Sequence, residues 1–214
     1  MDIVSEKTTF EVGDTIVINC TTVSHSAQSV QWFFNSNPIP EKQHTVISAD
    51  LSQLVIPYSN VSNAGNYSCT LLEALLEEIA TVQIQVGEKP HPVSSFKCFS
   101  FNAVDILCTW DDGGLTNIPT TSTLMYKAYY AEPSYPGFDW TACPDSGTSV
   151  KCPDLHSYTH SCFIYGYDHH YGSRHNFTVI VENALGTAAT WIHFNPEAEA
   201  YITRIWQNKK SVPT

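Results

Sequence analysis

The sequence lacks any long uninterrupted hydrophobic run. No stretch of about 18 apolar residues occurs among its 214 residues, so we expect no membrane span in this chain. The first residues, MDIVSEKTTFEVGDT, also lack the basic flank and the apolar centre of a secretory signal peptide. This start fits a mature or trimmed extracellular chain as well as a cytosolic one, so it does not decide the compartment.

Basic side chains are scarce. Lys and Arg number 10 against 21 Asp and Glu, and the formal net charge is −11 at pH 7. Such a surface repels a phosphate backbone, so nucleic acid is not expected as a partner. The charge balance favours a basic protein partner instead.

Sustained helical periodicity is nearly absent. Short apolar runs alternate with turn residues along the whole chain, which predicts an all-β fold. The run TLLEALLEEIA, Thr70 to Ala80, is the only helix-like segment, and the alternating TVQIQV that follows it favours a β-hairpin over a helix. One Gly and two Pro in VGEKPHPV, residues 86–93, predict a short, stiff linker between two halves that are each the size of a β-sandwich.

Motifs for catalysis are missing as well. Ser, His and Asp occur together near residues 168–175, but no nucleophile elbow surrounds them. The segment DDGG lacks the Lys-Ser/Thr that completes a phosphate-binding loop. We therefore expect neither an enzyme nor a bound cofactor.

Cysteine, in contrast, is plentiful. The chain contains seven cysteines, and it also carries four Asn-x-Ser/Thr sequons. This combination indicates an oxidising, glycosylating compartment and predicts an extracellular location. The predicted glycosylation sites are Asn19, Asn60, Asn66 and Asn176.

Four residues in residues 1–88 are spaced as in an immunoglobulin-like sandwich. Cys20 and Cys69 can come from opposite sheets, and the indole of Trp32 can then pack against their bridge. Tyr67 precedes Cys69 by two positions, where its hydroxyl can bond back to the preceding turn. This half therefore resembles an immunoglobulin-like domain. The alternative is a cytosolic fold with unpaired core cysteines, which the compartment argument disfavours.

The stretch KCFSFNAVDILCTW opens the second half and places Cys98 and Cys108 on strands that can pair directly. Zinc would require a second pair of ligands at similar spacing, and a redox pair is more often Cys-x-x-Cys. A structural disulfide is the favoured interpretation. Trp110 falls on the same side of its strand as Cys108, so we expect it in the core beside the bridge.

The second half resembles the ligand-binding region of a class I cytokine receptor. The pattern Cys-x9-Cys-x-Trp is similar to the first strands of that family's N-terminal fibronectin type III sandwich. FDWTACPD (138–145) and HSCFIY (160–165) look like the segments of the third and fourth cysteines, and FTVIVENALGTAATWIHFNP (177–196) looks like the last two strands. An immunoglobulin-like domain in front makes the order similar to the α-subunits of the interleukin-6 receptor group, which bind interleukin-11, interleukin-6 or ciliary neurotrophic factor. The resemblance implies an immunoglobulin-like sandwich followed by a fibronectin type III sandwich over residues 89–196.

The family's second short disulfide leaves a choice, because three cysteines remain. We favour Cys143 with Cys162 over Cys143 with Cys152, since Cys162 has the better strand context. A zinc site built from Cys152, His156, His160 and Cys162 is a weaker alternative, because no helix aligns the two histidines. The disulfides that this implies are Cys20–Cys69, Cys98–Cys108 and Cys143–Cys162, and no metal is expected.

The resemblance also implies a function. Members of this group bind a helical cytokine of the interleukin-6 family and present it to a shared signal-transducing subunit. The loop after the fourth-cysteine strand contributes to binding, and here it reads GYDHHYGSRH. Aromatic and arginine side chains are typical interface anchors, although the tyrosines could instead pack inward. The predicted ligand-binding residues are Tyr167, His169, His170, Tyr171 and Arg174.

The chain differs from the family at its end, where neither a third sandwich nor a Trp-Ser-x-Trp-Ser motif follows. We expect residues 197–214 to be a poorly ordered tail or a short strand, and the cytokine site to be incomplete without the third domain. The acidic charge slightly favours a basic ligand such as interleukin-11. Two alternatives stay open: an immunoglobulin-superfamily adhesion or immune-recognition protein, and a soluble receptor-like subunit of a heterodimeric cytokine.

Overall fold

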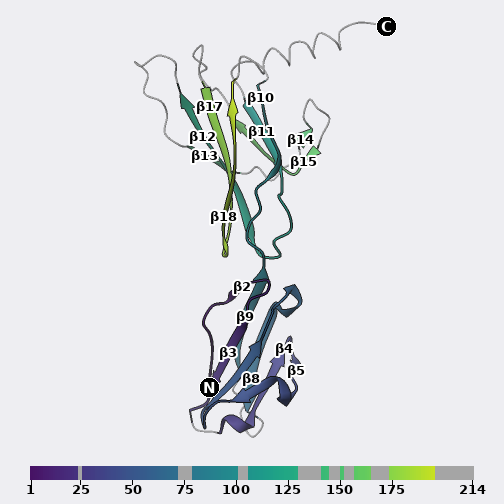
Figure 1. Cartoon of the computed structure of the whole chain (residues 1–214), viewed down its shortest axis with the longest axis vertical. Helices are drawn as coiled ribbons and strands as arrows, with labels where there is room; N and C mark the ends of the chain where they lie inside the picture. Colours follow the sequence, from purple (N-terminus) through teal and green to yellow (C-terminus); the bar gives the residue numbers. More distant parts are fainter. Residues whose placement is uncertain are drawn as a thin grey trace, which may run out of the picture. The chain divides into compact units, whose positions relative to one another are not determined.

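The protein is all-β, and its two parts are drawn in Figure 1. The computed structural model describes residues 1–23, 26–71, 79–100, 106–129, 141–144, 150–151, 157–164 and 174–195. None of the helices in these ranges has the length and hydropathy that a membrane crossing requires. The loop residues Tyr167, His169, His170 and Tyr171 and the tail from residue 197 lie outside the described ranges.

The chain forms two compact units. The first contains Met1–Lys89 together with Thr116–Pro119, and the second contains Pro90–Leu115 and Thr120–Thr214. The expected boundary at residue 88 does not include the segment 116–119 in the first unit. A backbone hydrogen bond attaches this segment to the first unit, because the amide of Glu88 donates to the carbonyl of Thr116 at 2.8 Å. A Cβ on Gly87 would stand 2.2 Å from that carbonyl oxygen, so glycine permits the close approach.

The first unit is a sandwich of two sheets. One sheet has the order β1-β3-β7-β6, and the other has the order β2-β9-β8-β4-β5. Three short 3₁₀ turns connect the strands: η1 (Ala27–Ser29), η2 (Glu41–Gln43) and η3 (Val61–Asn63). The strands are β1 (Asp2–Ser5), β2 (Thr9–Glu11), β3 (Ile16–Thr21), β4 (Val30–Phe34), β5 (Asn37–Pro38), β6 (His44–Val46), β7 (Leu51–Ile56), β8 (Gly65–Leu71) and β9 (Ala80–Gly87).

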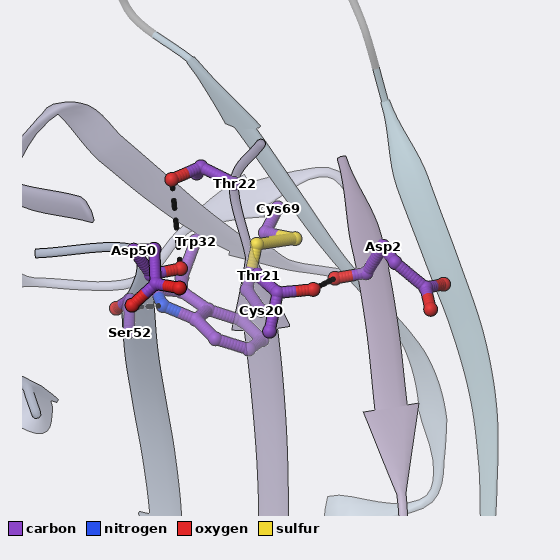
Figure 2. The surroundings of a disulfide bond; sticks show 8 residues. All are labelled: Asp2, Cys20, Thr21, Thr22, Trp32, Asp50, Ser52 and Cys69. Carbon is purple, nitrogen blue, oxygen red and sulfur yellow. Dashed lines mark hydrogen bonds between the residues drawn. A yellow bond between two sulfur atoms is a disulfide. The ribbon is translucent and has the colours of Figure 1, made fainter. Parts of the chain in front are cut away.

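The core of the first unit is organised around one disulfide. Cys20 on β3 is joined to Cys69 on β8, and strand alternation sends both side chains inward. The indole of Trp32 is fully buried, and its Nε1 donates to Ser52 Oγ at 2.9 Å (Figure 2). Ser52 pairs with Cys20 across β3 and β7, so the hydroxyl lies beside the bridge. The predicted packing of Trp32 near the bridge is therefore present.

Tyr67 ties the turn before β8 to the core. Its hydroxyl donates to the carbonyl of Asn63 at 2.9 Å, as its position two residues before Cys69 predicts. Burial raises the pKa of Tyr67 to about 12, so the hydroxyl remains protonated and keeps donating at physiological pH. The expected hairpin is also present, because β8 and β9 pair antiparallel from Gly65–Ile84 to Cys69–Ala80.

The second unit also packs two main sheets. One has the order β10-β11-β16, the other has the order β13-β12-β17-β18, and β14 and β15 form a separate small ribbon. This division into three and four strands fits a fibronectin type III sandwich. The strands are β10 (Ser94–Ser100), β11 (Ile106–Asp111), β12 (Thr120–Tyr129), β13 (Thr141–Pro144), β14 (Val150–Lys151), β15 (Ser157–Tyr158), β16 (His160–Ile164), β17 (Arg174–Asn183) and β18 (Gly186–Phe194).

Two disulfides staple the second unit. Cys98 on β10 is joined to its direct cross-strand neighbour Cys108 on β11. Cys143 on β13 is joined to Cys162 on β16, so this bridge connects the two sheets. Cys162 is consequently engaged in a disulfide and is not available as the zinc ligand that the alternative interpretation needed. Trp110 is fully buried in the same core as Cys108, as strand alternation predicts.

Candidate functional site: an exposed sheet face

The sequence-predicted ligand loop contributes only its last residue to the described structure. Arg174 is the first residue of β17 and pairs with Tyr129 at the end of β12. The other four predicted ligand-binding residues lie outside the described ranges. The candidate site among the described residues is therefore a different surface from that loop.

The outward face of the sheet β13-β12-β17-β18 carries an apolar centre. Leu124, Phe177, Val179 and Val181 point into the core, so their sequence neighbours on the same strands point outward. Three rows of cross-strand neighbours result, which we call the Trp191 face (Figure 1 shows these strands side by side). The rows are Lys127–Asn176–His193, Met125–Thr178–Trp191 and Thr123–Ile180–Ala189.

Trp191 is the largest exposed group on this face. Its side chain is 65% exposed although it lies in the interior of β18. Ile180 on the adjacent strand β17 is a diagonal neighbour of Trp191, and Met125 on β12 follows Thr178 in the row of Trp191; both side chains are half-buried. An exposed tryptophan within an apolar patch is more typical of a contact surface than of a free sheet face.

A polar cluster borders Trp191 on one side. The rings of Trp191 and His193 are 5.0 Å apart between centroids and meet edge to face at 66°. His193 Nδ1 is hydrogen-bonded to Asn176 Oδ1, and because a carbonyl oxygen can only accept, the proton lies on Nδ1. The indole, the imidazole and the amide thus form one connected group on the surface.

Charge on the face is sparse and mixed. Lys127 adjoins the polar cluster, whereas Glu182 lies towards the opposite end of β17. An apolar centre with a polar and charged rim is the ordinary composition of a protein-binding patch. The described residues contain no group of three or more His, Cys, Asp or Glu side chains that could hold a metal ion.

A second polar cluster lies on the other sheet of this unit. His160 Nε2 is 2.7 Å from Asp112 Oδ1, and the backbone amide of Thr159 donates to Asp111 Oδ1 at 3.0 Å. The His160 ring also stacks on Trp110 at 5.8 Å. These contacts fasten the start of β16 to the end of β11, so the cluster has a structural explanation.

The four predicted glycosylation sites lie on both units. Asn19 is on β3, Asn60 caps the turn η3, Asn66 is on β8, and Asn176 is on β17 within the Trp191 face. Asn60 Oδ1 accepts from the amide of Ser62 at 2.9 Å, which is a normal capping bond. Only the sequon at Asn176 lies beside an exposed tryptophan among the described residues.

Comparison with known proteins supports the fold of the first unit. Residues 1–86 match the immunoglobulin I-set domain family. Hemicentin-2 of Mus musculus is 32% identical over 74 residues, which is 35% of this chain and 2% of that protein. Receptor-type tyrosine-protein phosphatase F of Danio rerio is 21% identical over 130 residues, which is 61% of this chain and 6% of that protein. The chain therefore spans only a small part of these relatives.

A solved structure supports the two-sandwich architecture. The crystal structure of bovine butyrophilin matches with a TM-score of 0.51 at 14% identity, covering 91% of this chain and 98% of that chain. This similarity concerns the fold alone. None of these similarities points to the interleukin-6 receptor group in particular. Residues 1–86 are an immunoglobulin-like I-set domain.

Proposed function

We propose that this chain is an extracellular recognition module of the immunoglobulin superfamily, and that the Trp191 face binds a protein partner. The observation that carries the proposal is Trp191, which is 65% exposed on the outward face of the edge strand β18. The proposal assigns binding and no catalysis.

The extracellular location is supported by the cysteine chemistry. Three disulfides join six of the seven cysteines, and such bridges persist in oxidising compartments. The sequons on both units agree with passage through a glycosylating compartment.

The energetic argument concerns the removal of Trp191 from water. A tryptophan side chain buries roughly 150 to 250 Å² when it is fully covered, more than most other side chains. Ile180 is a diagonal neighbour of Trp191, and Met125 lies beyond Thr178 in the same row, so both apolar side chains can help to exclude water from the contact. Lys127 supplies a polar group at the rim. Truncation of such an anchor typically weakens a complex by about 2 kcal/mol or more.

The net charge of −11 indicates the sign of the partner. A basic partner would be steered towards this chain, and the association rate would fall as salt is added. The Trp191 face itself has little charge, so steering comes from the whole molecule while the apolar centre provides the contact.

The test is a binding screen of the intact, disulfide-bonded chain against an array of extracellular ectodomains. Three proteins are compared: the unaltered chain, Trp191→Ala, and Thr187→Ala, which changes an exposed residue on the same strand. A partner that is retained by Thr187→Ala and lost with Trp191→Ala supports the proposal. Equal binding by all three proteins contradicts it.

A cytokine-receptor function is the second candidate, and the disulfides of the second unit favour it. The Cys98–Cys108 bridge with buried Trp110 and the Cys143–Cys162 bridge match the pattern on which the resemblance to class I cytokine receptors rests. In this proposal the chain binds a helical cytokine of the interleukin-6 family and presents it to a shared signal-transducing subunit.

This second candidate is tested with a panel of interleukin-6-type cytokines. The expected result is weak binding of one cytokine, lost with Arg174→Ala and with Tyr171→Ala but retained by Trp191→Ala. Loss with Trp191→Ala alone would assign binding to the Trp191 face instead. Equal cytokine binding by the unaltered chain and by the Arg174→Ala and Tyr171→Ala variants contradicts the assignment of binding to this loop.

A further inference from the structure

A sequon lies within the Trp191 face. Asn176, Phe177 and Thr178 are consecutive on β17, and their side chains alternate between the two sides of the sheet. Phe177 is fully buried, so Asn176 and Thr178 both point outward. Thr178 pairs directly with Trp191 and Asn176 pairs with His193. Both polar positions of the sequon therefore adjoin the exposed aromatic cluster.

The Trp191 indole contacts the row that contains Asn176. Its ring centroid is 5.0 Å from that of His193, the cross-strand partner of Asn176. Asn176 and Trp191 are themselves diagonal neighbours on one face, a separation of about 7 to 8 Å between such positions. One sugar ring attached to the Asn176 amide is wide enough to span this separation and reach the indole.

The hydrogen bond between His193 and Asn176 is compatible with modification. His193 Nδ1 donates to Oδ1, whereas an N-linked sugar is attached at Nδ2. Attachment therefore leaves this bond in place, and the bond then holds the amide beside the aromatic cluster. An ordered amide restricts where the first sugar can lie.

Sugar rings and indole faces are chemically complementary. One face of an N-acetylglucosamine ring presents C–H groups, whose hydrogens carry partial positive charge. The face of an indole is electron-rich, so it attracts such hydrogens as it attracts the edge of another aromatic ring. This contact also removes apolar surface of Trp191 from water.

We propose that Asn176 carries an N-linked glycan whose first sugar stacks on Trp191 and covers the apolar centre of the Trp191 face. The attachment joins Asn176 Nδ2 to C1 of N-acetylglucosamine and breaks the bond from C1 to the pyrophosphate of a lipid-linked oligosaccharide donor. The amide proton leaves with the released pyrophosphate.

A regulatory consequence follows, and this part rests on the proposed function. The glycan and a protein partner compete for Trp191, so the chain without the Asn176 glycan binds the partner more tightly. Occupancy of the sequon then sets how much of the secreted protein is competent to bind.

Hydroxyl-radical footprinting of the full chain tests the contact without any partner. The chain is produced in secreting animal cells, and oxidation of the peptide that contains Trp191 is measured by mass spectrometry. Asn176→Gln removes the sequon, Thr178→Ser preserves it, and Asn66→Gln removes a sequon at an exposed position of the first unit. We expect several-fold more oxidation of Trp191 in Asn176→Gln, and unchanged oxidation in the other two variants.

Two results would overturn the proposal. One is an intact mass that shows Asn176 unmodified, and the other is equal oxidation of Trp191 with and without the glycan. Equal melting temperatures of the variants verify that folding is retained. Protection of Trp191 by the glycan, together with no partner found for the Asn176→Gln chain, would support the glycan contact while contradicting the proposed function. Unchanged affinity of Asn176→Gln for a partner that requires Trp191 would contradict the competition alone.

Discussion

At the scale of single residues, the first core depends on one polar contact beside its disulfide. Ser52 is fully buried and accepts the Nε1 proton of Trp32, which has no access to water. Ser52→Ala should leave that donor unsatisfied and lower the free energy of unfolding by about 1 to 3 kcal/mol in urea titrations. Ser48→Ala, at an exposed position, should change it by less than about 0.5 kcal/mol. Equal effects of the two variants would contradict the role of Ser52.

His44 makes the stability of the first unit dependent on pH. Both ring nitrogens are buried without a hydrogen-bond partner among the described residues, and burial lowers the pKa of His44, with a smaller opposing effect from Glu41. A lowered pKa in the folded state means that the unfolded chain binds the proton more readily. The stabilising contribution is therefore present above the unfolded pKa of about 6.5 and is lost as pH falls through the folded pKa.

The measurement for His44 is urea unfolding at pH 7.5 and pH 5.5. His44→Leu should lose less stability between these two values than the unaltered chain does. The other histidines contribute equally to both proteins, so the difference isolates His44. Identical losses in the two proteins would contradict the assignment.

At the scale of elements, two consecutive residues of β12 point to opposite sides of the sheet, one into the core and one onto the Trp191 face. Leu124 is fully buried, and its neighbour Met125 points outward beside Thr178. Leu124→Ala should lower the free energy of unfolding by about 2 to 5 kcal/mol. Met125→Ala should cost well under half of that and weaken partner binding instead. A larger stability loss for Met125→Ala would mean that the face is assigned to the wrong side of the sheet.

The pairing of β10 with β11 is reinforced by the Cys98–Cys108 disulfide. Replacement of both cysteines by alanine removes the cross-link without leaving a free thiol. The loop is short, so the loop-entropy argument predicts a loss of about 2 to 3 kcal/mol, read as a lower melting temperature. An unchanged melting temperature would show that the bridge does not stabilise this strand pair.

The core residues of both units could be predicted from the sequence because their spacing along the chain is typical of a β-sandwich. The spacing typical of an immunoglobulin-like sandwich identified the core residues Cys20, Trp32, Tyr67 and Cys69. Trp110 was expected in the core because it lies two residues after Cys108 on the same strand. The last two strands were expected from the resemblance of residues 177–196, and in the structure the amide of Leu185 donates to the side chain of Asn183 in the turn between β17 and β18. Local chemistry determines such features, so the sequence suffices to predict them.

The Trp191 face could not be read in the same way, because it depends on register between distant strands. Met125 and Thr178 become neighbours only through the pairing of β12 with β17. The sequence did contain one local signal. Side chains alternate along β18, so Trp191 and His193 point to the side opposite to buried Phe194, which is the outward side. The segment 116–119 was missed for a related reason, because a backbone bond to Glu88 carries no side-chain signature.

At the scale of the whole molecule, an acidic chain forms two disulfide-bonded sandwiches, and the second carries the Trp191 face. The disulfides stabilise the scaffold, and the charge influences how quickly a basic partner arrives. The contact itself is assigned to a few side chains on one sheet. This separation predicts that salt changes mainly the association rate, whereas changes at Trp191 alter mainly the dissociation rate.

The most direct measurement is the dissociation constant of the intact chain lacking the Asn176 glycan for a partner identified in the ectodomain screen, determined with and without Trp191→Ala. Loss of an anchor worth about 2 kcal/mol corresponds to a roughly 30-fold weaker complex. We expect at least that weakening for Trp191→Ala, and no more than about twofold for Thr187→Ala on the same strand. Equal dissociation constants for the unaltered and Trp191→Ala proteins would contradict the assignment of binding to the Trp191 face.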